Sequence, residues 1–310
     1  MDRSAIAMTL SLRKLLALLL VPAAVASCSG QQVLNSLTST SGFNRSTNLP
    51  YEKASGLTLD VYKPNNQNDR PTVVFFYGGR WSSGNKKDFE FVGGALASAG
   101  YCTVIPDVRQ YPMVRFPAFV EDGAKAIKWV HDKIDDYGCD SKRVFVMGHS
   151  SGAHVAAMLA LNEQFLKGVG GSRTWLRGMI GLAGPYDFLP LTDPMLRDLF
   201  GPVDKFEQSQ PILYVDGQNP PLLLMAGEDD EIVPVKNTRS LAASVARAGG
   251  PVETVIYPKM PHARLLSSIG PYMRNQSDVL AQITSFLDKW TTSPYQRNTG
   301  PSFETTPFTP

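Results

Sequence analysis

The chain has 310 residues, enough for one large α/β domain with a substantial core and too few for two such domains. Hydrophobic residues make up 43% of the chain and charged residues 19%, which is the composition of an ordinary globular protein. The formal net charge is only +2, and the sequence has no Lys/Arg cluster that could bind phosphates. We therefore expect no nucleic-acid partner.

The first 27 residues are predicted to be a signal peptide. Arg13 and Lys14 precede an apolar run over 15–25 that is too short for a stable membrane span. The run ends in VASC, which resembles the bacterial lipobox, where the cysteine, here Cys28, is lipid-modified and becomes the first residue. This pattern predicts an exported bacterial lipoprotein that acyl chains alone hold at a membrane. An ordinary signal peptide, with Cys28 incidental, is the alternative.

Two polar segments flank the predicted domain, which spans residues 50–290. Residues 28–49 are rich in Ser, Thr, Asn and Gln and are expected to form a flexible tether after the lipidated cysteine. Residues 291–310 are rich in Pro, Thr and Ser and are expected to be a disordered tail.

Strand and helix patterns alternate between these segments. Strands are predicted at 57–62, 71–77, 101–106, 143–147, 179–182, 222–225 and 254–257, and helices at 88–99, 117–137, 151–161, 236–248 and 276–290. Such alternation predicts an α/β fold, with a mostly parallel central sheet flanked by helices. Residues 162–220 fit the alternation poorly, and we expect a small cap or lid insertion there. Cys102 and Cys139 are not expected to pair.

A G-x-S-x-G pentapeptide, residues 148–152, lies between a predicted strand and a predicted helix. A sharp turn at that junction exposes a strained nucleophile, and the flanking glycines let the backbones approach one another. Ser150 is therefore the candidate nucleophile. The alternative is a small-residue turn without chemistry.

A nucleophilic serine needs a base that is oriented by a carboxylate. Of the four histidines, His262 follows a late strand and is the candidate base, although it could be an exposed loop residue. The acid is expected between Ser150 and His262 in chain order. Four consecutive acids at 228–231 leave its identity open on composition alone.

An oxyanion hole is predicted after the first buried strand, at Gly78, Gly79 and Arg80. Consecutive glycines let backbone N–H groups turn toward a substrate, and the N–H of Ser151 would join those of Gly79 and Arg80. A tight turn without such a role is the alternative.

Four stretches carry a resemblance over about residues 57–290: YGGRW, PDVRQYPMVRFPAFVEDGAKAIKWV, GHSSGAH and AGEDDEIVP. They resemble the esterase/lipase branch of the α/β-hydrolases. That branch includes kynurenine formamidase-like and isoprenylcysteine methylesterase-like enzymes and borders the hormone-sensitive-lipase family. The resemblance implies the α/β-hydrolase fold, selects Asp230 as the acid with Asp229 as the fallback, and implies a structural pair of Arg109 and Asp122.

The expected substrate pocket contains Tyr77, Trp81, His149 and Asp187. Tyr77 stands where the family usually has His, and the cation of Arg80 would favour a polar or anionic group near the carbonyl.

Together these features predict a serine carboxylesterase for short to medium acyl esters, with a small-molecule substrate and no metal or cofactor. An amide or formamide hydrolase of the same fold is one alternative, and an inactive binding lipoprotein is another. The oligomeric state stays open.

Overall fold

The computed structural model describes residues 30–38 and 41–292 of the chain. The predicted signal peptide, Cys28 and the tail from residue 293 lie outside the described residues. None of the described helices has the length and apolar character needed to cross a lipid bilayer.

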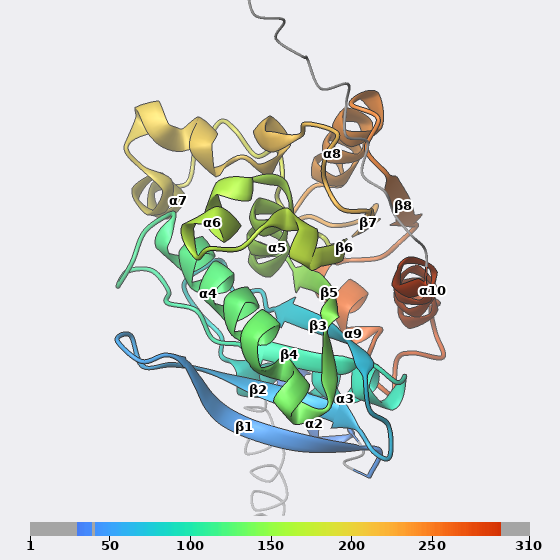
Figure 1. The fold of residues 1–310 in the computed structure, drawn as a ribbon. Coiled ribbons are helices and arrows are strands. Elements are labelled where there is room, and N and C mark those ends of the chain that lie inside the picture. The colour runs from blue at the N-terminus through green and yellow to red at the C-terminus, as the bar shows by residue number, and fades with distance from the viewer. Residues whose placement is uncertain (1–29, 39–40, 293–310) are drawn as a thin grey trace, which may run out of the picture.

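An eight-stranded sheet forms the centre of the molecule, in the strand order β1-β2-β4-β3-β5-β6-β7-β8 (Figure 1). The strands are β1 Phe43–Glu52, β2 Leu57–Pro64, β3 Arg70–Phe76, β4 Cys102–Pro106, β5 Cys139–His149, β6 Leu176–Leu182, β7 Leu222–Gly227 and β8 Val252–Tyr257. Strand β2 pairs antiparallel with β1 and β4, and every other pair of neighbours is parallel. The predicted mostly parallel sheet is confirmed.

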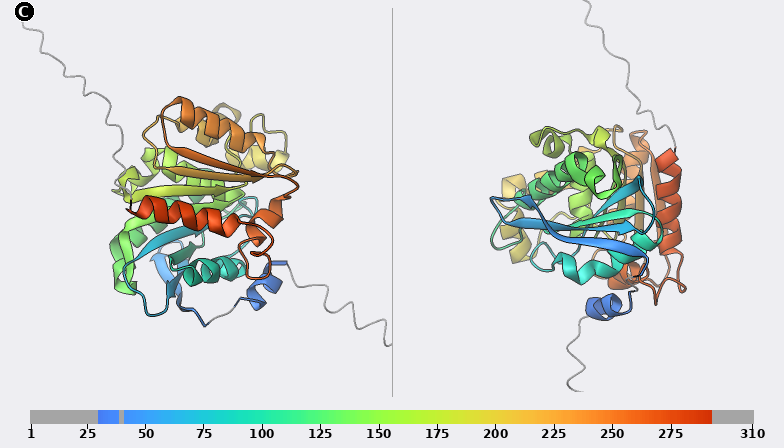
Figure 2. Two further views of the ribbon diagram at one scale, coloured as in Figure 1. Left: turned by 90° about the vertical axis from the view of Figure 1, so that its right-hand side faces the viewer. Right: turned by 60° about the horizontal axis from the view of Figure 1, so that its bottom comes forward.

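Helices cover both faces of this sheet. They are α2 Gly30–Ser36, α3 Glu90–Ser98, α4 Ala118–Lys133, α5 Ser151–Leu161, α6 Glu163–Gly168, α7 Pro194–Phe200, α8 Lys236–Arg247, α9 His262–Ser267 and α10 Val279–Thr292. Helices α4, α5 and α8 bury apolar side chains on one face, and α3, α9 and α10 on the other. Figure 2 shows α10 lying along its face of the sheet. Successive residues of β3, such as Val73 and Val74, belong to the cores on opposite faces of the sheet, as expected for a strand buried on both faces.

The prediction of a flexible tether is wrong for the described part of residues 28–49. Residues of β1 pair with β2, and α2 is fixed to the domain through Asn35. The Asn35 side chain accepts a hydrogen bond from the N–H of Phe91 (2.9 Å) and donates one to the carbonyl of Lys87 (2.7 Å). Backbone pairing and these polar contacts order a segment that has few large apolar side chains.

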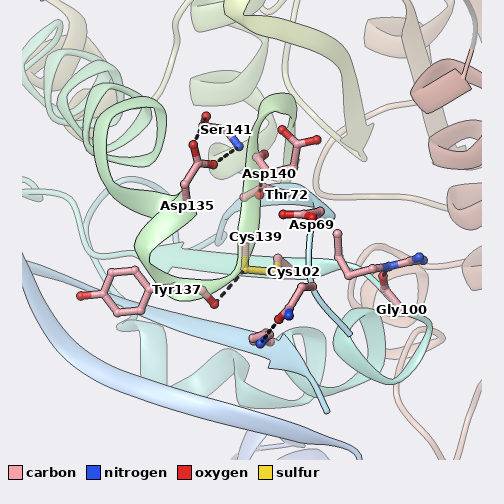
Figure 3. The surroundings of a disulfide bond; sticks show 12 residues. Asp69, Thr72, Gly100, Cys102, Asp135, Tyr137, Cys139, Asp140 and Ser141 are labelled. Atoms are coloured by element: carbon pink, nitrogen blue, oxygen red, sulfur yellow. Dashed lines mark hydrogen bonds between the residues drawn. A yellow bond between two sulfur atoms is a disulfide. The ribbon is translucent and has the colours of Figure 1, made fainter. Parts of the chain in front are cut away.

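Cys102 and Cys139 form a disulfide bond, with their Cα atoms 5.9 Å apart (Figure 3). The expectation that they do not pair is wrong. Each cysteine is the first residue of its strand, and β4 and β5 are the two neighbours of β3. A register shift in the pairing of β3 with β5, between Pro71 and Thr72, accompanies their approach. Strand order and register, which local sequence patterns do not specify, therefore bring the two residues together.

Candidate active site

Ser150 occupies the turn between β5 and α5 in a strained conformation, with φ 55° and ψ −125°. Positive φ is costly for a residue with a side chain and persists only where the surroundings impose it. Here the N–H of Ser150 donates to the carbonyl of Leu182 on β6 (2.9 Å), and its carbonyl accepts from the N–H of Ala153 (2.9 Å). The neighbouring strand and the first turn of α5 therefore hold the serine in place.

Glycines make this turn possible. A Cβ atom on Gly148 would lie 2.2 Å from the carbonyl oxygen of Gly152, and one on Gly152 would lie 2.0 Å from that of Phe76. A Cβ atom on Gly78 would come within 3.0 Å of the Cβ of Ser150. The turn and the loop after β3 thus approach so closely that side chains at these positions would separate them.

Asp230 and His262 form a buried hydrogen-bonded pair, with 2.7 Å between Asp230 Oδ2 and His262 Nδ1. Asp230 Oδ1 also accepts from the backbone N–H groups of Ile232 (3.0 Å) and Val233 (2.8 Å). Burial raises the pKa of Asp230, but the hydrogen bonds from His262 and Val233 outweigh burial and leave the pKa below its usual value. The carboxylate is therefore ionised and able to orient the imidazole.

Of the four consecutive acids, Asp230 is the buried one. Glu228 forms an ion pair with Arg239 (2.7 Å), and Asp229 and Glu231 are exposed. The geometry therefore favours Asp230 over the fallback Asp229.

His262 is the first residue of α9, where the sequence predicts a loop. Its ring centroid lies 4.7 Å from that of His149, the residue before Ser150, so the imidazole lies beside the turn. Within the described part of the chain, neither Ser150 Oγ nor His262 Nε2 makes a hydrogen bond. In ligand-free enzymes, the hydrogen bond between a catalytic base and its nucleophile is often long and tightens only when substrate binds.

The loop after β3 has three consecutive residues with positive φ: Gly79 (145°), Arg80 (54°) and Trp81 (58°). Among the residues that the structure describes, nothing accepts a hydrogen bond from the backbone N–H of Gly79, Arg80 or Ser151. An oxyanion hole requires free N–H groups next to the nucleophile, and these three N–H groups are candidates for that role beside Ser150.

A cavity of about 550 Å³ opens beside Ser150. Much of its wall comes from the segment between β6 and β7, where the sequence predicts a cap, and is apolar: Pro185, Phe188, Leu189, Pro190, Leu191 and Leu196. Arg80 also lines the cavity, but its guanidinium forms an ion pair with Asp193 (2.8 Å). The negative charge of Asp193, which lies in the same segment, therefore neutralises the positive charge of Arg80. The cavity suits an apolar group of moderate size.

Trp81 lines this cavity, but the other three residues predicted for the pocket do not. The Tyr77 hydroxyl donates to Asp107 (2.8 Å), and the ring of His149 packs against His262. The backbone N–H of Asp187 donates to the side chain of Asn237 (2.9 Å). Tyr77, His149 and Asp187 therefore contact residues next to the cavity beside Ser150 instead of lining it.

The implied pair of Arg109 and Asp122 is present, with two guanidinium N–H donors 2.7 and 2.8 Å from the carboxylate oxygens. Two residues near the site escaped the sequence prediction. Asn237, at the start of α8, lines the cavity and accepts from the N–H groups of Tyr186 and Asp187. Asp107 directly follows β4, and a polar residue at the carboxyl end of a parallel strand was a signal that could have identified it.

Comparison with known proteins identifies the family of the chain. A family model described as BD-FAE matches residues 59–245. A protein of Arabidopsis thaliana named as a probable isoprenylcysteine alpha-carbonyl methylesterase is 31% identical over 231 residues, covering 67% of this chain and 48% of that protein. The esterase LipQ of Mycobacterium tuberculosis is 28% identical over 235 residues, covering 70% of this chain and 55% of that protein. The chain thus spans about half the length of the curated relatives it matches.

Solved structures agree on the fold. A truncated carbohydrate esterase from gut microbiota superposes with a TM-score of 0.72 at 20% identity, covering 83% of this chain and 99% of that one. At that level of identity the likeness concerns the fold alone.

Proposed function

The chain belongs to the BD-FAE family and has the α/β-hydrolase fold, and from this premise we propose that it is a serine carboxylesterase acting on short to medium acyl esters. The observation that carries the proposal is the buried pair of Asp230 and His262 beside the strained turn of Ser150. Esterase names among the relatives support the reaction class.

In the proposed reaction, His262 Nε2 takes the proton of Ser150 Oγ as that oxygen attacks the ester carbonyl. Asp230 holds the imidazole through Nδ1 and stabilises the imidazolium that forms. The backbone N–H groups of Gly79, Arg80 and Ser151 bind the oxyanion of the tetrahedral intermediate.

Collapse of this intermediate breaks the ester C–O bond, and His262 returns its proton to the departing alcohol. The acyl group is then bound to Ser150. Water, deprotonated by His262, attacks the acyl-enzyme, and release of the acid restores the serine hydroxyl. The apolar cavity wall between β6 and β7 would hold the acyl chain.

A replacement of the nucleophile tests this function. Ser150→Ala should lower kcat on a short p-nitrophenyl ester by at least about a thousandfold, because the covalent step is lost. Ser141→Ala is the matched control, since Ser141 lies at the opposite end of β5 and bonds to Asp135. Turnover by Ser150→Ala close to that of the wild type would reject the proposal.

Export as a lipoprotein anchored through Cys28 is a second part of the proposal. The disulfide between Cys102 and Cys139 supports export, because such bonds persist in oxidising compartments. Metabolic labelling with an alkyne fatty acid in a bacterial host should mark the wild type and not Cys28→Ala. Equal labelling of the two would contradict the assignment.

A further inference from the structure

The loop from Tyr77 to Asn85 joins β3 to the short helix η2 (Lys86–Phe89) in a conformation that side chains disfavour. Arg80 and Trp81 have φ of 54° and 58°, directly after Gly79 at 145°. Consecutive non-glycine residues in this region do not stay there unless their surroundings impose it. Bonds within the loop, from the N–H groups of Ser82 and Ser83 to the carbonyl of Gly79 (3.0 Å each), and contacts from outside it therefore hold this conformation together.

The carboxylate of Asp107 bonds to both ends of this loop. Its Oδ1 accepts from the hydroxyl of Tyr77 (2.8 Å) at the start and from the backbone N–H of Lys86 (2.8 Å) just after the end. Its Oδ2 accepts from Lys86 Nζ (3.0 Å). The Asp107 side chain thus connects the two ends of the loop.

Asp107 is itself held rigidly. Its N–H donates to the carbonyl of Thr58 on β2 (3.1 Å), and its carbonyl accepts from the hydroxyl of Tyr51. Lys86 is only 4% exposed, and its Nζ also donates to Thr58 Oγ1 (3.0 Å). Lys86 Nζ also lies 3.8 Å from Asp60 Oδ1, so moving the loop end away from Asp107 would cost this buried ammonium the shorter of its two ion pairs.

Tyr77 supplies the contact at the other end. Its ring stacks on Phe89, with centroids 5.1 Å apart and planes 7° apart. Burial and the charge of Asp107 raise the pKa of Tyr77, so its hydroxyl keeps the proton and donates it to the carboxylate. The ring and the hydroxyl together fix the residue from which the strained backbone departs.

We propose that Asp107 is a positioning residue for the oxyanion hole: by bonding to Tyr77 and Lys86 it holds the N–H groups of Gly79 and Arg80 in place for the developing oxyanion. This inference rests on the proposed function, since it assumes that these N–H groups bind an oxyanion. Asp107 touches neither the cavity beside Ser150 nor any group of the proposed triad; it acts through the loop.

The experiment compares Tyr77→Phe with Tyr101→Phe. Both variants remove a buried tyrosine hydroxyl that donates to an aspartate, and in Tyr101 the acceptor is Asp288 on α10, away from the loop. On a short p-nitrophenyl ester, kcat should fall about tenfold in Tyr77→Phe with KM changed less than about twofold, because a loosened hole binds the transition state less well. Tyr101→Phe should keep kcat within about twofold.

Inhibition by a trifluoromethyl ketone, which forms an oxyanion on the enzyme, separates positioning from loss of stability. Its Ki should rise in Tyr77→Phe by the same factor as kcat falls, and more strongly in Asp107→Asn. Active-site titration corrects each rate for folded enzyme. Tyr77→Phe remains informative if Asp107→Asn does not fold.

The outcomes separate the two proposals. A wild-type protein without esterase activity would overturn the proposed function. An active wild type whose Tyr77→Phe variant matches Tyr101→Phe in kcat and Ki would overturn the role of Asp107 alone.

Discussion

His154 lies on α5, one turn beyond Ser150, and both of its ring nitrogens are occupied. Trp81 Nε1 can only donate, so it donates to Nδ1 of His154 (3.3 Å), and the proton must be on Nε2, which donates to the carbonyl of Ser209 (2.8 Å). Burial lowers the pKa of His154 to about 4. The neutral ring thereby connects the loop that contains Trp81 to the segment between β6 and β7 that contains Ser209.

This burial predicts a pH-dependent stability. The usual pKa of 6.5 applies to the unfolded chain, so between about pH 6.5 and pH 4 the unfolded state binds a proton that the folded state does not. Stability is complete above that window and falls as pH is lowered through it, by about 1.4 kcal/mol per pH unit for each such histidine. His149, whose pKa burial lowers to about 3, adds to the slope.

In His154→Gln, the slope of unfolding free energy against pH should become shallower by the contribution of one histidine. Urea unfolding at about pH 5, 6 and 7 measures the slope. Parallel slopes for the variant and the wild type would mean that His154 is protonated in the folded state or exposed there.

Sequence patterns select Ser150 and His262 as candidates because each follows a strand in a recognisable order. They left the acid open among four residues, since burial of Asp230 depends on how the loop folds. The same dependence applies to Tyr77, His149 and Asp187, which were expected in the pocket but do not line the cavity beside Ser150. Hydrogen bonds to residues distant in the chain hold the side chains of Tyr77 and His149 and the backbone of Asp187.

At the level of elements, the regular strands and helices of the α/β core follow from apolar periodicity, although some observed bounds differ from the predicted ones, as in β5, which begins at Cys139 where the prediction began at 143. Strand β1 and helix α2 were not predicted because backbone pairing and polar contacts, not apolar side chains, hold them in place. Such contacts leave no apolar pattern in the sequence. Helix α9 has only six residues, too few for a periodic signal.

The segment between β6 and β7 should determine which acyl groups fit. Phe188 lines the cavity and packs against Trp81 and Phe200, with centroids 6.2 and 5.5 Å away. Phe188→Ala should lengthen the cavity and raise the ratio of kcat/KM for a long acyl ester over a short one by about tenfold, the size of effect expected for a few methylene groups. A panel of p-nitrophenyl esters of increasing acyl length measures this ratio.

Phe206→Ala serves as the control, because Phe206 is buried nearby but does not line the cavity. An unchanged acyl-length profile in Phe188→Ala would place the acyl site elsewhere.

Across the whole molecule, the disulfide and the candidate site lie at opposite ends of the parallel strands. Cys102 and Cys139 begin their strands, whereas Ser150 follows the end of β5. The bond joins residues 37 apart in the chain, and a loop of that length stabilises the fold by about 4 kcal/mol in the chain-entropy model. Stability and catalysis should therefore be separable.

The double variant Cys102→Ala, Cys139→Ala should lose about this much unfolding free energy and keep kcat at 25 °C within about twofold. Urea unfolding and ester hydrolysis measure the two quantities. Wild-type protein reduced with dithiothreitol provides the control, and it should match the double variant in stability. A large loss of kcat in folded variant protein would show that the bond also shapes the site.

Covalent labelling can show whether Ser150 is an activated nucleophile. A fluorophosphonate reacts with a serine that is activated by a base and an oxyanion hole, and peptide mass spectrometry identifies the modified residue. We expect a single adduct on the peptide that contains Ser150, absent from Ser150→Ala and strongly reduced in His262→Ala. No adduct, or an adduct on another residue of the folded protein, would contradict it.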